Sequence, residues 1–346
     1  MRAAVAVLCM AWCAAAAGRY QIRLRLPEGG LFAREEMQIE FRVEDTSRPD
    51  PLSGFAPVIR AAPDATIEMP AMAGMPKFSE VAHAEGAPGD YGIHPTFAHG
   101  GEYRLTLRVH PPGGEVFEQA FTLDVADARP KPGPPRYSLD VAAQPKRPKA
   151  GEPVELQLVV RDRETGAVQA FDIAHEKLMH LVIVRKDLGQ FAHEHPEPGA
   201  GGTFSLRYTF PTGGEYHLFA DVAPRGAGSQ VVMAKVKISG PEGPAFDIRK
   251  STPLMDNLPA RKTVPLSFAV PPDIEPYLGA AGHLMLVHED GESFVHSHPA
   301  DDAPSGGELH FLARLPKPGL YRGWLQVQRA GKIETTALVV RAEQRP

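Results

Sequence analysis

The sequence predicts an all-β protein in which three tandem antiparallel β-sandwich domains follow a signal peptide. The apolar runs are short and rich in Val, Ile, Leu, Phe and Tyr, and turn signals separate them about every 8–12 residues. The 33 glycines and 35 prolines make up about one residue in five, which favours turns over long helices. No convincing helical periodicity is evident. Representative runs are Val154–Val160, Leu181–Val184, Phe204–Phe210, Val231–Ile238 and Thr335–Val340.

Two clusters of Pro and Gly predict the linkers between the domains. They are Ala126–Pro135 and Gly240–Pro244, where extended connections are expected. The resulting segments, 18–127, 136–239 and 246–343, each have about 100 residues, which is an ordinary domain size.

The first 17 residues have the pattern of a secretory signal. Met1–Ala17 begins with Arg2, continues with an apolar run and ends in small residues. We therefore expect a periplasmic or secreted protein, and no later apolar run is long enough to span a membrane. Both cysteines, Cys9 and Cys13, lie in this leader, so the mature chain is expected to have no disulfide and no thiolate metal site.

The charge balance argues against a polyanionic partner. The chain has 37 basic and 42 acidic residues, for a formal net charge of −5, and no basic stripe. Nucleic acid and anionic membrane surfaces are therefore not expected as partners.

A short phrase recurs once in each segment and supports the repeat interpretation. Each copy places a tyrosine shortly after a glycine, at the start of a late strand. This arrangement resembles the tyrosine corner of immunoglobulin-like sandwiches. The three copies are Phe97–Tyr103, Phe210–Tyr216 and Leu315–Tyr321.

Histidines recur with identical spacing in the second and third segments. In both, the second histidine follows the first by 13 positions and the third follows the second by two, directly before a proline. Imidazole is a ligand for copper and zinc, so we expect each trio to bind a metal ion; the alternative is surface histidines inherited through duplication. The two trios are His180, His193, His195 and His283, His296, His298.

Strand geometry explains why this spacing brings three imidazoles together. Asp290-Gly291 predicts a two-residue type I′ hairpin turn. In such a hairpin each residue before the turn pairs with the residue that lies equally far after it. His283 and His298 are then opposite each other on one face, with His296 and Met285 beside them. In the second segment the same arrangement requires a turn centred on Asp187-Leu188, because a slip of one residue would move His180 to the other face.

The first segment has a methionine cluster in place of a trio. Met69, Met72 and Met75 lie in a stretch whose prolines and glycine exclude a helix. Thioethers select Cu(I), so the loop is a candidate Cu(I) site; the alternative is that the methionines fill an irregular loop over the core. His83, His94 and His99 follow closely and would supplement such a site. His175, His217, His288 and His310 have no partner in the other repeat and are interpreted as ordinary.

The methionine stretch, followed by Gly100–Tyr103, resembles the YtkA-like (FixH-related) domain. That resemblance implies a small exported immunoglobulin-like module associated with copper handling. The second and third segments resemble repeats of exported bacterial proteins associated with heavy-metal transport. The phrases that carry this resemblance are 175–180, 186–196, 276–283 and 324–328.

Three function classes remain open from the sequence. The leading hypothesis is a metal-binding protein that buffers or transfers copper, with zinc as the alternative ion and a metal transporter or another metallochaperone as partner. The second is an enzyme with a three-histidine catalytic metal and an open fourth position. The third is a structural or interaction array of sandwiches that holds no metal. No phosphate loop, nucleophile elbow or catalytic cysteine is present.

Overall fold

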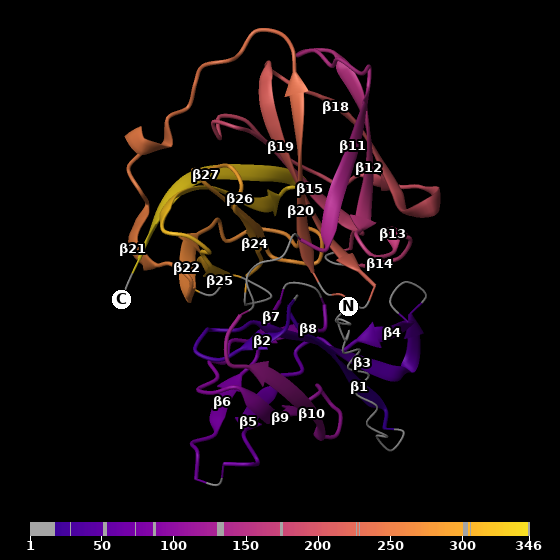
Figure 1. Ribbon diagram of the computed structural model, residues 1–346, viewed down its shortest axis with the longest axis vertical. Coiled ribbons are helices and arrows are strands. Elements are labelled where there is room, and N and C mark those ends of the chain that lie inside the picture. The colour runs from indigo at the N-terminus through magenta and orange to yellow at the C-terminus, as the bar shows by residue number, and fades with distance from the viewer. Residues whose placement is uncertain are drawn as a thin grey trace, which may run out of the picture. The chain divides into compact units, whose positions relative to one another are not determined.

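The computed structural model (Figure 1) describes most of the chain beyond the predicted leader, and Met1–Ala17 lies outside the described residues. The chain forms two compact units. The first comprises the chain up to His83 together with Tyr91–Arg129; the second comprises Ala84–Asp90 and the chain from Pro130 onward. The described residues are 18–27, 29–50, 54–72, 74–85, 88–129, 135–173, 176–225, 227, 229–299, 304 and 306–344.

The first unit contains two sheets around one hydrophobic core. Alternate residues of β9 are buried, as expected for strands with one face on a core. One sheet consists of β1 (Tyr20–Arg25), β3 (Ile39–Asp50), β4 (Gly54–Pro57), β7 (His83–Ala84) and β8 (Asp90–Ile93). The other consists of β2 (Leu31–Phe32), β5 (Asp64–Glu68), β6 (Phe78–Val81), β9 (Gly101–Val109) and β10 (Phe117–Ala126).

The second unit contains both histidine segments, here called the N-terminal repeat (136–239) and the C-terminal repeat (246–343). The N-terminal repeat is a sandwich of two five-stranded sheets. Its outer sheet has β11 (Tyr137–Gln144), β12 (Pro153–Asp162), β13 (Gly166–Ala167), β17 (Glu197–Pro198) and β18 (Thr203–Thr209). Its inner sheet has β14 (Phe171–Asp172), β15 (Met179–Arg185), β16 (Phe191–Glu194), β19 (Gly214–Pro224) and β20 (Gln230–Ile238).

The C-terminal repeat has a larger inner sheet and a two-stranded outer sheet. The inner sheet has β21 (Met255–Pro259), β23 (His283–His288), β24 (Phe294–Ser297), β26 (Gly319–Arg329) and β27 (Lys332–Glu343); the outer sheet has β22 (Thr263–Ala269) and β25 (Glu308–Arg314). Helix in the described residues is limited to the 3-10 turns η1 (Ala200–Gly202) and η2 (Ile248–Lys250), and none there is long and apolar enough to cross a membrane. The predicted all-β class is confirmed.

The three recurring tyrosines form the same contact in each segment. The Tyr103 hydroxyl donates to the carbonyl of His99 (3.0 Å), the Tyr216 hydroxyl to that of Thr212 (3.0 Å), and the Tyr321 hydroxyl to that of Lys317 (2.8 Å). A glycine with φ between 131° and 135° lies two residues before each tyrosine. The hydroxyl therefore returns to the backbone four residues upstream, which is the geometry of a tyrosine corner.

The two repeats pack through their inner sheets. An apolar cluster containing Val182, Phe219, Met285 and Trp324 joins the sheets, in addition to the separate core of each repeat. Strands β15 and β23 are consequently buried along their whole length. A strand covered on both faces is expected to be a continuous apolar run rather than an alternating one.

The contacts between the repeats come in matched pairs. Phe191 stacks on Trp324 (centroids 4.4 Å apart), and the equivalent Phe294 stacks on Phe219 (4.9 Å). Arg322 donates to the carbonyl of Leu188 (2.6 Å), and a nitrogen of the equivalent residue, His217, contacts the carbonyl of Gly291. Such reciprocal contacts are those of a two-fold interface between like units.

The predicted register of both histidine hairpins is confirmed. Met285 pairs with His296 in the C-terminal repeat, and Val182 pairs with His193 in the N-terminal repeat. Continuing the same register along the strands places His283 opposite His298 and His180 opposite His195.

The predicted type I′ turn is wrong. That turn requires positive φ at both central residues, but of Asp290 and Gly291 only Gly291 has a positive φ (70°). The turn forms instead through Gly291 N–H to His288 O (2.8 Å), and the Asp290 carboxylate accepts the backbone N–H groups of Glu292 and Ser293. These local bonds hold a four-residue loop, and the flanking strands keep the predicted register.

Candidate metal centre

All six recurring histidines form one cluster at the interface between the repeats. β15 carries His180 and β23 carries His283, and these two strands belong to the facing inner sheets. The side chains of His180 and His283 are buried, with 1% and 0% of their surface exposed. The ring centroids of His180 and His193 lie 5.4–6.1 Å from those of His283 and His296 in the other trio.

Within each trio, one nitrogen of the first histidine faces the other two rings. Nδ1 of His180 lies 3.2 Å from Nε2 of His193 and 3.2 Å from Nε2 of His195. Nδ1 of His283 lies 3.4 Å from Nε2 of His296 and 3.0 Å from Nε2 of His298. The two trios therefore use the same atoms in the same roles.

Hydrogen bonds to oxygen fix the tautomers of two rings in the His283 trio. Nε2 of His283 donates to the carbonyl of Tyr277 (2.8 Å), so Nδ1 carries the lone pair. Nδ1 of His296 donates to the carboxylate of Asp221 (2.8 Å), so Nε2 carries the lone pair. Nδ1 of His283 and Nε2 of His296 consequently face each other as acceptors across 3.4 Å, and Nε2 of His298 lies 3.0 Å from the same Nδ1.

Each trio is oriented by a residue of the other repeat. Asp221, which pairs with His180 on the neighbouring strand, accepts from His296; Gln326, which pairs with His283, accepts from Nδ1 of His193 (2.9 Å). Gln326 in turn donates to Thr335 (3.1 Å), which fixes its oxygen as the acceptor. A hydrogen bond from the remote nitrogen is the usual way in which a metal-binding imidazole is held in position.

Burial favours the neutral form of three of the six rings, those of His193, His195 and His296. Loss of solvent, followed by the neighbouring rings of His193 and His180, lowers the pKa of His195 to about 2. Burial also lowers the pKa of His193 and, most strongly, that of His296, whose neighbours again favour the neutral ring. Neutral imidazole is the form that binds metal.

The distances suit a metal ion. Two nitrogens bound at about 2.0–2.1 Å to a tetrahedral ion are about 3.3–3.4 Å apart, close to the 3.0–3.4 Å found within the trios. Nitrogens of His283, His296 and His298 all lie within 4.8 Å of one another, and so do nitrogens of His180, His193 and His296. His296 thus belongs to both groups, and the two sites expected in separate domains are one continuous cluster.

Met285, expected beside the His283 trio, is fully buried in the apolar cluster between the repeats. It pairs with His296 on β24 and with Trp324 on β26. The structure therefore accounts for it as part of the packing that supports β23, and its role as a ligand stays a prediction.

The methionines of the first unit have different surroundings. Met69 and Met75 pack against the hydrophobic core, whereas Met72 is 45% exposed. Packing thus accounts for two of the three, and the Cu(I) site stays a prediction. Of the histidines expected to supplement it, His83 and His94 stack at 4.8 Å and form a group with Glu80 whose ligand atoms lie within 4.8 Å of one another.

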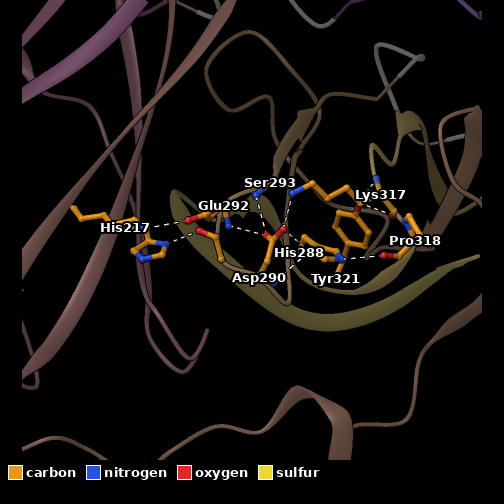
Figure 2. A network of polar contacts seen from close by, with 10 residues as sticks. His217, His288, Asp290, Glu292, Ser293, Lys317, Pro318 and Tyr321 are labelled. Atoms are coloured by element: carbon orange, nitrogen blue, oxygen red, sulfur yellow. Dashed lines mark hydrogen bonds and ion pairs between the residues drawn. The ribbon is translucent and has the colours of Figure 1, made fainter. Parts of the chain in front are cut away.

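The remaining histidines have structural surroundings where they are described. His217 contacts the tip of the C-terminal hairpin, where His288 contacts Asp290 and the carbonyl of Pro318 (Figure 2). A ring nitrogen of His310 forms a hydrogen bond with the hydroxyl of Ser267 (2.8 Å). The backbone carbonyl of His99 accepts a hydrogen bond from the hydroxyl of Tyr103. His175 lies outside the described residues.

Sequence reasoning missed the three residues that orient the cluster: Asp221, Gln326 and Tyr277. A signal for two of them was present, because Asp221 and Gln326 each lie five residues after a corner tyrosine. Aligning the repeats on Tyr216 and Tyr321 places them at equivalent positions. Their contacts cross between the repeats, so no pattern within one hairpin reveals them.

Comparison with known proteins finds a family match in each of the two parts of the chain. Residues 137–239 and 248–344 each match the family described as Domain of unknown function (DUF8832), and residues 14–108 match the family described as YtkA-like. Both histidine trios lie within the first pair of matches. No curated protein matches the chain.

Two solved bacterial adhesins are among the similar structures. The first, a 1.5-MDa ice-binding adhesin involved in host cell surface retention, is 9% identical with a TM-score of 0.25, over 94% of this chain and 99% of that one. The second, a Ca²⁺-stabilised adhesin of an Antarctic bacterium, is 11% identical with a TM-score of 0.24, over 95% and 75%. The two family matches at 137–239 and 248–344 together cover more than half of the 346 residues, and the chain therefore belongs to the DUF8832 family.

Proposed function

We propose that this chain is an exported metal-binding protein that takes up copper in the six-histidine cluster and buffers the ion or transfers it to another protein. Export is inferred from the leader-like Met1–Ala17. Imidazole-only ligand sets suit Cu(II) and Zn²⁺, so zinc is the competing ion. The YtkA-like match covers the segment that contains the methionine loop, a second candidate location for Cu(I).

One observation carries the proposal. Nδ1 of His283 and Nε2 of His296 face each other across 3.4 Å, and each nitrogen has its lone pair directed inward because the other ring nitrogen donates to an oxygen. Two acceptors cannot hydrogen-bond to each other, and burial disfavours a proton between them. Nε2 of His298 lies 3.0 Å from the same Nδ1, so a metal cation among the three nitrogens would accept a lone pair from each ring.

The enzymatic alternative is less well supported. A catalytic metal needs an open position that substrate can reach, whereas the first histidine of each trio is buried between the two repeats. Burial of this kind suits retention of an ion.

The proposal is tested by titrating Cu(II) and Zn²⁺ into the purified chain and measuring retained metal after desalting. We expect the variant His193→Ala, His195→Ala, His296→Ala, His298→Ala to lose the bound metal while keeping the β-sheet circular dichroism spectrum. His110→Ala and His310→Ala are matched controls, because these histidines bond Asp64 and Ser267 outside the cluster. Unchanged metal content in the fourfold variant would overturn the proposal and favour an array without metal.

A further inference from the structure

The six histidines have an inner and an outer set. The ring contacts between the trios, at 5.4–6.1 Å, join His180 and His193 to His283 and His296. His195 and His298 each lie against the rings of their own trio, at 4.7–4.9 Å and 4.4–4.7 Å respectively. The cluster is therefore elongated, with one outer histidine in each repeat.

Matched contacts support one inner histidine of each trio. Asp221 orients His296 and Gln326 orients His193, so each repeat supports a ring of the other trio. An interface of this reciprocal kind presents the same groups from both sides. In each trio Nδ1 of the first histidine lies 3.0–3.4 Å from Nε2 of the other two, and a nitrogen of His296 in addition lies within 4.8 Å of nitrogens of His180 and His193.

Six nitrogen donors exceed what one four-coordinate ion uses. Three nitrogens per ion leave one position free on each. A hydroxide derived from water would supply an oxygen ligand at such a position, as oxygen ligands do in two-metal sites. The Asp221 carboxylate behind His296 would offset part of the repulsion between two cations.

We propose that the cluster holds two copper ions as a coupled pair, one in each trio, with the inner histidines between them. This inference rests on the proposed metal-binding function and adds the number of ions and their proximity. His296 occupies the central position, because its nitrogens lie within 4.8 Å of nitrogens of both His180 and His193 and also within 4.8 Å of those of its own trio.

The test is copper stoichiometry combined with electron paramagnetic resonance of the full chain loaded with Cu(II). We expect two coppers per chain and an integrated spin intensity below the copper content, or a half-field transition, because the two spins couple. Loading with a large excess of Zn²⁺ over Cu(II) dilutes the pairs and should restore full intensity per copper.

Variants of the outer histidines provide the matched comparison. His195→Ala and His298→Ala should each retain one copper per chain with full, uncoupled spin intensity. One copper per wild-type chain, or two coppers with full intensity, would overturn the pair while leaving metal binding intact. Absence of bound copper and zinc would overturn the proposed function as well.

Discussion

Nδ1 of His296 lies 2.8 Å from the carboxylate of Asp221, and this bond crosses from the C-terminal repeat to the N-terminal one. The carboxylate also accepts from the hydroxyl of Ser229 (2.8 Å), which holds it in place. A metal site built on His296 therefore depends on the other repeat. The two sandwiches must pack together before the ligand set is complete.

Replacing this carboxylate should weaken metal binding without unfolding the chain. We expect Asp221→Asn to lower copper affinity by about 10–100-fold, the usual cost of removing an outer hydrogen-bond partner of a metal ligand. Competition with a chelator of known affinity measures the copper affinity of each variant. Asp140→Asn is the matched control, because Asp140 is an exposed partner of Arg161 in the same repeat. Equal affinities for the two variants would contradict the role of Asp221.

The stability of the metal-free protein should fall as the pH falls below about 6.5. His193, His195 and His296 have lowered pKa values when folded, but titrate near 6.5 in the unfolded chain. In acid the unfolded state therefore binds more protons, and the free energy of unfolding decreases. The expected loss is up to about 1 kcal/mol for each histidine at one pH unit below 6.5.

Denaturant unfolding at pH 7.5 and 5.5 measures this effect. The fourfold histidine-to-alanine variant is the reference, and its free energy of unfolding should change less between the two pH values. A wild-type protein as stable at pH 5.5 as at 7.5 would show that the cluster accepts protons freely when folded.

Fluorescence of Trp324 should report Cu(II) binding. Trp324 and Gln326 are two residues apart on β26, so they share a face at a spacing of about 6.6 Å, and Gln326 bonds His193. We expect Cu(II) to quench the emission and a chelator to restore it. The other tryptophan, Trp12, lies in the predicted leader. Quenching of equal strength in the fourfold variant would show that the copper responsible lies elsewhere.

Loss of packing between the repeats should impair both stability and metal binding. Phe219 is 1% exposed and stacks on Phe294 at the interface. We expect Phe219→Ala to lower the free energy of unfolding by about 3–5 kcal/mol, as for other buried phenylalanines, and to lower copper affinity because the trios lose their alignment.

The matched control is Phe204→Ala. Phe204 is also 1% exposed but lies in the core of the N-terminal repeat, against Phe171. We expect Phe204→Ala to lower the free energy of unfolding about as much as Phe219→Ala does. The copper affinity of the folded Phe204→Ala protein should be unchanged. If both variants affect copper affinity equally, the interface has no specific role in binding.

The sequence by itself determined the strands, the tyrosine corners and the register of both hairpins. These features depend on neighbours in the chain: alternation along a strand places His283 and Met285 on one face, and turn residues near Asp290 set the pairing. Even where the predicted turn type was wrong, the register was right, because both loops satisfy the same pairing of the flanking strands.

Only the tertiary structure decided that the two trios meet. Sheet packing depends on apolar surfaces far apart in the chain, and the contact between Phe191 and Trp324 joins residues 133 positions apart. The continuously buried strands β15 and β23 indicate that both of their faces pack against other parts of the protein. They do not indicate which part packs there. The partner of His296 is Asp221 because the inner sheets pack face to face, and local spacing contains no information about that contact.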